Sequence, residues 1–226
     1  MQVTERKERE TARDYALRVL KENIISLDLA PGSMVSENEI SLKLGLSRTP
    51  VREALIELNR ANIVEIYPQK GSKILLIDYT QVEESRFLRL VLESAVVMLL
   101  CNKEEALDLS ALEENLKLQQ FYLENPNPEK LLELDDAFHF QLFTLANKTQ
   151  SYNWMIKGLS VHFDRVRSMS LNTIKDIQIV SDHKVLLKAI REKDSEGALS
   201  CIDKHLSRYK VDEQVLREKY PTYFSI

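Results

Sequence analysis

Residues 44–55 read LGLSRTPVREAL, and this segment carries the signals that organise the N-terminal part of the chain. Gly45 ends one helical stretch, and Ser47 follows as an N-cap for the next. Pro50 is tolerated because its missing N–H group falls in the first turn, where helical N–H groups have no partner. The segment therefore predicts two helices joined by a tight turn.

The flanking residues extend this pattern to a winged helix-turn-helix. An N-terminal helical stripe stops at Pro31-Gly32, and Ser36 with Glu39 forms a capping box. Two β-type runs follow, separated by a hairpin turn, and Asn62 is suited to the left-handed position before them. The predicted elements are helices over 11–29, 36–43 and 47–61 and strands over 63–67 and 72–77. This order is typical of a winged helix-turn-helix domain, which we assign to residues 1–77.

The remainder, residues 78–226, shows helical periodicity and no convincing strand. Apolar residues recur at intervals of three and four, as in Leu131, Leu134, Phe138 and Leu142. The predicted helices cover 80–101, 105–124, 128–147, 149–168, 171–192 and 194–217. We expect a mainly α protein, in which the winged helix-turn-helix precedes an all-α antiparallel helical bundle.

Composition bounds the classes of protein that are possible. The chain has 226 residues, of which 44% are hydrophobic and 29% charged, and its formal net charge is -4. A uniformly basic coat for nucleic acid is excluded, but a local basic surface is not. Cys101 and Cys201 form neither a disulfide framework nor a zinc motif. The apolar run 95–101 is too short to span a membrane, which needs roughly 20 residues, so we expect a cytoplasmic protein with no membrane partner.

Arg48 and Arg52 are the main candidates for contact with DNA bases. They lie four residues apart near the start of the second turn-flanking helix, so both project from the end that enters a major groove. An arginine fork pairs bidentately with guanine and gives about 1–3 kcal/mol of base discrimination. The hydroxyls of Ser47 and Thr49 suit phosphate oxygens. Taken alone, two such arginines would more often be solvated or paired with neighbouring glutamates.

The predicted hairpin tip offers a second contact with DNA. Lys70 there suits a phosphate or the minor groove, and Gly71 permits close approach of the backbone. Both residues are therefore added to the candidate DNA-binding set.

Several segments together resemble the GntR family of bacterial transcription regulators. They are Leu29-Ala30-Pro31-Gly32, Ser36-Glu37, the 44–55 block and Lys70-Gly71. The resemblance implies a homodimer that binds a palindromic operator in double-stranded DNA, with Arg48 and Arg52 at base-contacting positions. Asn38 stands where some members place a further DNA-contacting arginine, which leaves the operator sequence open. Asn62 stands where glycine is usual, and this departure is benign because Asn also adopts positive φ.

A candidate metal site lies in the helical half. Asp135 and His139 are four residues apart and share a helix face. His183 precedes the cap residue Asp194 by eleven residues and His205 follows it by eleven, so the two imidazoles come level in an antiparallel helix pair. One carboxylate and three imidazoles suit a divalent ion such as Zn, Ni or Mn. Each histidine alone could instead be an ordinary core or surface residue.

The same residues resemble the FCD effector domain of FadR-type GntR regulators. The resemblance implies that Asp135, His139, His183 and His205 hold the metal, and it favours Asp135 over Asp136. His162 matches no ligand position, so it is expected to be structural. The departure at 147–148 from the family's usual Gly-Asn affects the expected rim of the pocket.

Arg89 and Glu93 match the family's Arg-x-x-x-Glu pattern. One reading is an intrahelical ion pair of about 0.2–0.5 kcal/mol. The other is that Arg89 points into the cavity and holds an anionic effector by bidentate hydrogen bonds. Arg165 and Arg167 are further candidates for that role.

These observations predict a sensor and not an enzyme. A small organic acid would bind at the metal and alter the affinity for DNA, with repression as the family's default. A metal-dependent hydrolase is the rival interpretation, and it would need a separate acid or base, for which Asp136 is the nearby candidate. A third interpretation is that the metal only stabilises the bundle.

Overall fold

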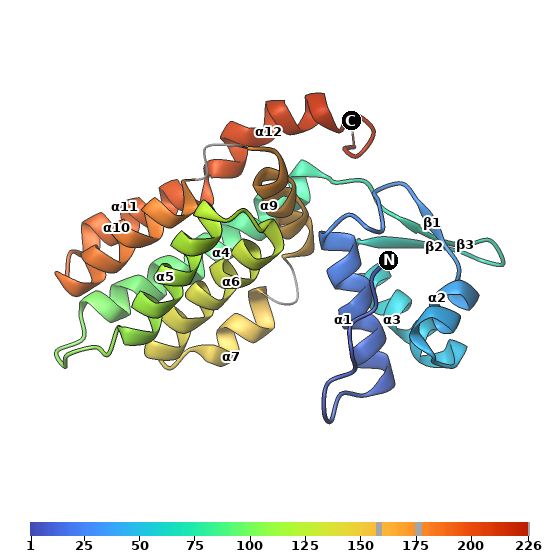
Figure 1. Ribbon diagram of the computed structural model, residues 1–226, viewed down its shortest axis with the longest axis horizontal. Helices are drawn as coiled ribbons and strands as arrows, with labels where there is room; N and C mark the ends of the chain where they lie inside the picture. Colours follow the sequence, from blue (N-terminus) through green and yellow to red (C-terminus); the bar gives the residue numbers. More distant parts are fainter. Residues whose placement is uncertain (157–159, 175–177, 226) are drawn as a thin grey trace.

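The computed structural model describes residues 1–156, 160–174 and 178–225. A helical bundle forms one side of the molecule, and a smaller unit with a short sheet forms the other (Figure 1). Helix α12 (Arg208–Lys219) runs from the bundle toward the connection between the two parts. The C-terminal residues therefore lie beside that connection.

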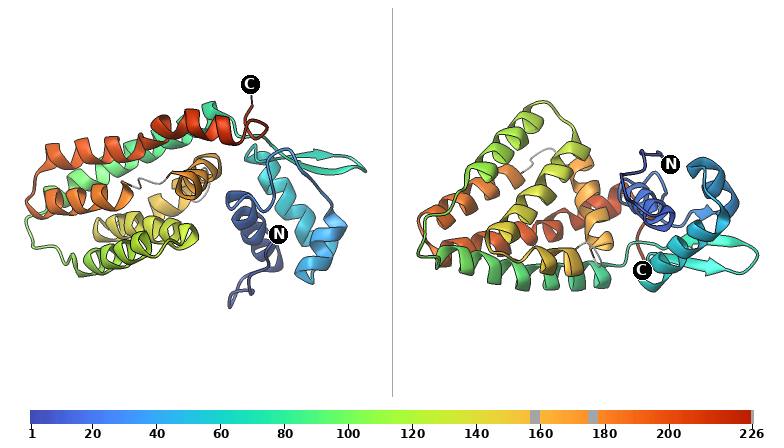
Figure 2. Two further views of the ribbon diagram at one scale, coloured as in Figure 1. Left: turned by 45° about the horizontal axis from the view of Figure 1, so that its top comes forward. Right: turned by 90° about the horizontal axis from the view of Figure 1, so that it is seen from below.

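The smaller unit is a winged helix-turn-helix. Its elements are α1 (Ala12–Ile25), β1 (Met34–Val35), α2 (Glu37–Leu44), α3 (Arg48–Arg60), β2 (Val64–Tyr67) and β3 (Gly71–Ile74). The sheet is antiparallel with strand order β1-β3-β2. Apolar side chains of the three helices close the core, among them Leu20, Val51 and Leu55, each 0% exposed. Two views in Figure 2 show the β2–β3 hairpin projecting from this unit.

Local signals in the sequence act as predicted at several helix ends. The Ser36 side chain accepts hydrogen bonds from the N–H groups of Asn38 and Glu39 at the start of α2. Gly45 ends α2 with φ of +64°, and Asn62 follows α3 with φ of +55°. The left-handed conformation of both residues ends the helix and turns the chain toward the next element. The predicted strand pair is present, and β1 was missed because two residues carry no pattern.

The larger unit is a bundle of helices. Its elements are α4 (Tyr79–Cys101), α5 (Ser110–Glu124), α6 (Pro128–Leu145), α7 (Thr149–Ser151), the π-helix η1 (Tyr152–Ile156), α9 (Val161–Thr173), α10 (Ile179–Arg191) and α11 (Ser195–Leu206). Phe138, Phe143 and Leu100 lie in its core, each no more than 1% exposed. Among the described helices, none combines the length and apolar character that crossing a membrane requires.

Helix boundaries after residue 148 differ from the prediction. The expected helices 149–168 and 171–192 are replaced by α7, η1, α9 and α10, and residues 157–159 and 175–177 lie outside the described residues. The expected helix 194–217 divides at Ser207 into α11 and α12. Periodicity did not reveal this break because Leu206 and Tyr209, which flank it, are both buried and continue the apolar repeat.

The connection between the units is held by the C-terminal segment 223–225. The N–H of Ile77 donates to the carbonyl of Tyr223 at 2.8 Å, and the N–H of Ser225 donates to the carbonyl of Ile77 at 3.0 Å. One buried apolar cluster draws on residues 15–74 with Val161, and the other on residues 77–224. This division of the core supports the domain boundary that we predict after residue 77.

Candidate metal centre and DNA-binding surface

One aspartate and three histidines from three helices converge inside the bundle. Asp135 and His139 come from α6, His183 from α10 and His205 from α11, and one ligand atom of each lies within 4.8 Å of the others. Nε2 of His139 is 3.1 Å from Nε2 of His205 and 3.4 Å from Nε2 of His183. Oδ1 of Asp135 is 3.3 Å from Nε2 of His183 and 3.7 Å from Nε2 of His205. Adjacent ligands of an ion held at about 2.1 Å lie about 3.0–3.4 Å apart, so the spacing is close to a coordination shell.

Outer partners turn the imidazole nitrogens toward this point. Nδ1 of His183 lies 2.8 Å from Oε1 of Gln119, whose amide nitrogen donates to Asn115. Nδ1 of His139 lies 2.7 Å from Oε2 of Glu93. The Gln119 oxygen only accepts, so Nδ1 of His183 carries the proton and its Nε2 presents a lone pair. The negative charge of Glu93 beside Nδ1 of His139 favours the same tautomer there. Burial lowers the pKa of His139 and of His183, which keeps both imidazoles neutral. Lone pairs facing each other at 3.4 Å favour a cation between them.

Asp135 supplies a buried carboxylate, and one of its two oxygens is free to bind an ion. Its Oδ2 accepts a hydrogen bond from Arg167, which also pairs with Asp136 at 2.8 Å and Asp164 at 2.6 Å. Its Oδ1 has no hydrogen-bond partner among the described residues. Burial would raise the pKa of Asp135, but the charge of the Arg167 guanidinium holds it well below its usual value. An ionised oxygen beside imidazole lone pairs is a donor set that divalent transition metals prefer, so the residues fit a metal ion.

Asp182 and Arg208 form an ion pair beside His205. Its Nδ1 lies 3.6 Å from Oδ2 of Asp182, and Asp182 accepts hydrogen bonds from two nitrogens of Arg208, one of them at 2.6 Å. Burial raises the pKa of Asp182, but His205 and Arg208 together lower it to about 2. The carboxylate therefore stays ionised and available to the imidazole.

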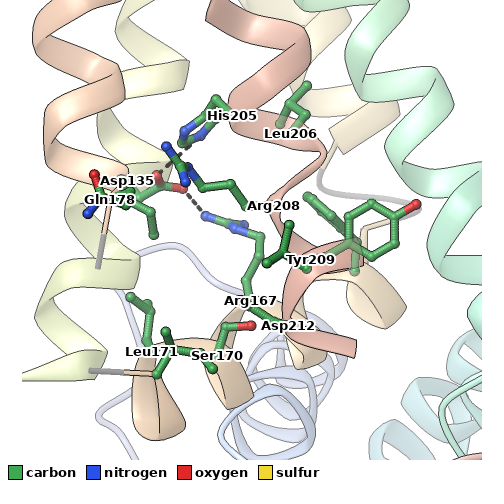
Figure 3. A pocket seen from close by; sticks show the side chains of 14 residues that line it. Asp135, Arg167, Ser170, Leu171, Gln178, His205, Leu206, Arg208, Tyr209 and Asp212 are labelled. Carbon is green, nitrogen blue, oxygen red and sulfur yellow. Dashed lines mark hydrogen bonds and ion pairs between the residues drawn. The ribbon is translucent and has the colours of Figure 1, made fainter. Parts of the chain in front are cut away.

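A cavity of about 290 Å³ opens beside the four residues of this cluster (Figure 3). Asp135 and His205 line it, together with Arg167 and Arg208. A molecule in the cavity would thus meet two members of the cluster and two guanidinium groups.

Arg89 does not line this cavity in the described part of the chain. It is 2% exposed, and its Nε donates to Oε1 of Glu93 at 2.5 Å, which is the predicted i, i+4 pair. Burial opposes the charge of Glu93, but His139 and Arg89 lower its pKa to about 2. Nη1 and Nη2 of Arg89 have no hydrogen-bond partner among the described residues. Arg89 here supports the outer partner of His139, and its contact with an effector stays a prediction.

The arginine pair of α3 is open to solvent. Arg48 is exposed and has no ion-pair partner among the described residues. Arg52 is 69% exposed, with its Nε 3.2 Å from Oε1 of Glu37. An exposed ion pair contributes about 0–1 kcal/mol, so Glu37 holds Arg52 only weakly. Ser47 and Thr49 are also exposed, and within the described chain the Ser47 side chain makes no capping hydrogen bond.

The tip of the wing has a structural reason for its glycine. Lys70 is exposed, and its N–H donates to the carbonyl of Tyr67 at 3.0 Å. Gly71 has φ of +106°, and a Cβ atom there would lie 2.7 Å from the carbonyl oxygen of Val35. Only glycine lets β3 approach β1 at this point, so Gly71 is required for the wing whether or not it touches DNA.

Helix α9 is tied to the smaller unit by a relay of hydrogen bonds. The fully buried Arg165 donates to the carbonyl of Leu75 at 2.8 Å and to Nδ1 of His162 at 2.9 Å. Because a guanidinium only donates, Nδ1 accepts, and the Nε2–H of His162 donates to the carbonyl of Asn62 at 3.0 Å. Burial and the charge of Arg165 lower the pKa of His162 to about 4, so it is neutral. One helix thus contacts the residue that follows α3 and the connection after β3.

Both parts of the chain match known families. Residues 15–74 match "Bacterial regulatory proteins, gntR family" and residues 84–208, more than half of the chain, match "FCD domain". The HTH-type transcriptional repressor RspR of Escherichia coli K12 is 30% identical over 209 residues, which cover 92% of this chain and 91% of that protein. The chain belongs to the GntR family.

Solved structures agree with the fold of this GntR regulator. Escherichia coli McbR/YncC superposes with a TM-score of 0.76 at 23% identity and covers 93% of this chain and 99% of its own. A transcriptional regulator from Rhodococcus sp. RHA1 has a TM-score of 0.66 at 21% identity, over 93% and 98% of the two chains. The predicted family and the predicted architecture, a winged helix-turn-helix followed by an FCD domain, are confirmed.

Sequence reasoning on the GntR regulator missed the outer partners of the cluster. Gln119 carries no charge and gave no signal in the sequence. Asp182 directly precedes His183, and Arg208 lies one turn after His205, but neither spacing is diagnostic. Arg167 was a secondary candidate, and it is the guanidinium that contacts Asp135 and lines the cavity.

Proposed function

We propose that this GntR regulator binds a palindromic operator as a homodimer and represses transcription. We further propose that a small carboxylate effector, bound with a divalent metal ion such as Zn, Ni or Mn, changes its operator affinity. The observation that carries the proposal is the joining, in one chain, of an exposed arginine pair on α3 to a buried Asp/His cluster beside a cavity. RspR, at 30% identity, is itself named a transcriptional repressor, which supports the direction of control.

The roles of the DNA-facing residues follow from their positions. Arg48 and Arg52 would read base edges in the major groove, where the start of α3 would enter. Ser47 and Thr49 would contact phosphates that flank it. Lys70, held at the tip of the wing by the turn that ends in Gly71, would contact a phosphate or the minor groove.

The roles of the cluster follow from its donor atoms. Asp135, His139, His183 and His205 would hold the ion, which supplies open coordination positions for carboxylate oxygens when bound. Arg167 keeps Asp135 ionised and oriented, and it adds positive charge at the same end of the cavity. Catalysis would need a free acid or base, and Asp136, the nearby candidate, pairs with Arg167. A sensor therefore fits the site better than a hydrolase.

An apolar stripe on α4 supports a homodimer. Phe87, Val91, Met98 and Leu99 are between 43% and 55% exposed, and their spacing places them along one helix face. A stripe of this kind is usually covered by a partner. A second copy would cover it and also supply the second α3 that a palindromic operator requires.

Helix α9 is suited to carry the signal. On one side Arg167 contacts Asp135, and on the other Arg165 and His162 hold the carbonyls of Leu75 and Asn62. A displacement of Asp135 would reach the end of α3 through this single rigid element. Coupling of this kind requires that the two arrangements bind the effector unequally.

Replacing Arg165 with methionine should uncouple the two units while leaving the metal site intact. In the wild-type protein, zinc should slow amide hydrogen exchange both in α9 and in connection residues 75–78. In Arg165→Met the slowing should persist in α9 and disappear in the connection, because the hydrogen bond to the Leu75 carbonyl is lost. Arg191→Met, on the exposed face of α10, is the control. Equal slowing of the connection in both variants would rule out this path.

Selection of DNA fragments by the purified protein tests the proposed function itself. We expect enrichment of an inverted repeat, with two protein chains per duplex by light scattering. Recovery of fragments with no shared sequence would refute operator recognition.

A further inference from the structure

The cavity beside the cluster carries charged groups of both signs at one end, and most of its remaining wall is apolar. Its apolar lining comes mainly from α9 to α12, and includes Phe163, Leu171, Ile174, Ile179, Leu206 and Val211. In Figure 3, Asp135 and His205 gather with the guanidinium of Arg208, and Leu171 and Ser170 lie at the end away from His205. An anionic head and an apolar body match these two regions.

The far end of the cavity disfavours a second anionic group. The described lining there offers Ser170 and Asp212 and no cation. A second carboxylate would lie near the carboxylate of Asp212 without a counter-charge, which is costly in a partly buried site.

The apolar wall also disfavours a chain of hydroxyl groups. Oγ of Ser170 is buried and has no hydrogen-bond partner among the described residues, so it could satisfy one polar atom. Further hydroxyls along the wall would lose their hydrogen bonds to water and gain none.

The size of the cavity limits the length of the apolar body. A volume of about 290 Å³ holds roughly ten groups of the size of a water molecule, at about 30 Å³ each. A saturated monocarboxylate of eight carbons has that number of non-hydrogen atoms.

We propose that the effector is an amphipathic monocarboxylate of medium length, with its carboxylate at the Asp135 and His205 end and its apolar tail along α9 and α10. This inference rests on the proposed metal-dependent binding of a carboxylate, and it names the class of molecule. Arg167 and Arg208 favour the anionic head, and Leu171, Ile174 and Ile179 select the tail.

Calorimetric titration of the zinc-loaded full chain with acetate, butyrate, hexanoate, octanoate, succinate and glycolate tests the proposal. Each added methylene should tighten binding about fourfold, since burial of one methylene contributes about 0.8 kcal/mol. Hexanoate should bind more than 100-fold tighter than acetate, and octanoate tighter still, whereas succinate and glycolate should bind no better than acetate.

Variants separate the tail from the head. Leu171→Asn should flatten the dependence on chain length and leave acetate binding unchanged, and Ile179→Asn is the second variant if the first does not fold. Leu118→Asn makes the same exchange on the exposed face of α5 and should retain the full dependence. A flat series in the wild-type protein, or tightest binding by succinate or glycolate, would overturn the inference and leave the proposed function standing. Failure of every carboxylate to bind would overturn both.

Discussion

Alanine in place of Arg48 and Arg52 should abolish sequence-selective DNA binding. Each bidentate contact with guanine is worth about 1–3 kcal/mol, and a dimer on a palindrome loses each contact twice. We expect operator affinity in the double variant to fall by at least about 100-fold. Binding to unrelated DNA should fall much less, because the phosphate contacts proposed for Ser47, Thr49 and Lys70 would remain.

Arg60→Ala is the matched control for this experiment. Arg60 is 75% exposed near the C-terminal end of the same helix, so its loss removes the same charge without reaching a base. Fluorescence anisotropy with the selected operator and with a scrambled duplex measures both affinities. Full selectivity in the double variant would contradict the assignment of α3 as the reading helix.

Glutamine in place of His183 should remove the bound metal. His183 is fully buried and contributes one of the converging Nε2 atoms, and loss of even an outer partner typically lowers metal affinity about 10–100-fold. In the wild-type protein, zinc at 100 times its Kd should stabilise the fold by about 2.7 kcal/mol. For a chain of this size that is a rise in Tm of roughly 5–10 °C. The variant should show neither the rise nor stoichiometric zinc after dialysis.

His162→Gln provides the control for metal content. As in His183→Gln, glutamine replaces a buried histidine. His162 hydrogen-bonds to Asn62 and Arg165 and does not belong to the cluster. It should keep about one zinc per chain. Stoichiometric zinc in His183→Gln, or its loss in His162→Gln, would count against the proposed ligand set.

Short-range signals in the sequence predicted much of the fold and the grouping of the candidate metal ligands. The 44–55 segment predicted the helix-turn-helix because caps and left-handed residues act locally, as Gly45 and Asn62 show. The equal spacing of His183 and His205 from Asp194 placed both imidazoles in one cluster because a tight turn fixes the register of the two helices that it joins.

The sequence patterns did not predict contacts between residues far apart in the chain. Gln119 is uncharged and comes from a helix distant in sequence, so nothing marked it as the partner of His183. Arg167 and Arg89 carry the same charge, and only the packing of α9 against α6 decides that Arg167 meets Asp135. The boundaries of α9 were wrong for a related reason, since a buried helix shows apolar or paired residues on most of its faces.

The most direct test of the central claim is the operator affinity of one preparation with and without metal, across the carboxylate series. We predict that at least one monocarboxylate changes the Kd of the zinc-loaded protein for its operator by about tenfold, and that none does so after treatment with EDTA. An unchanged Kd in the presence of a carboxylate that calorimetry shows to be bound would contradict the claim that the cluster controls DNA binding.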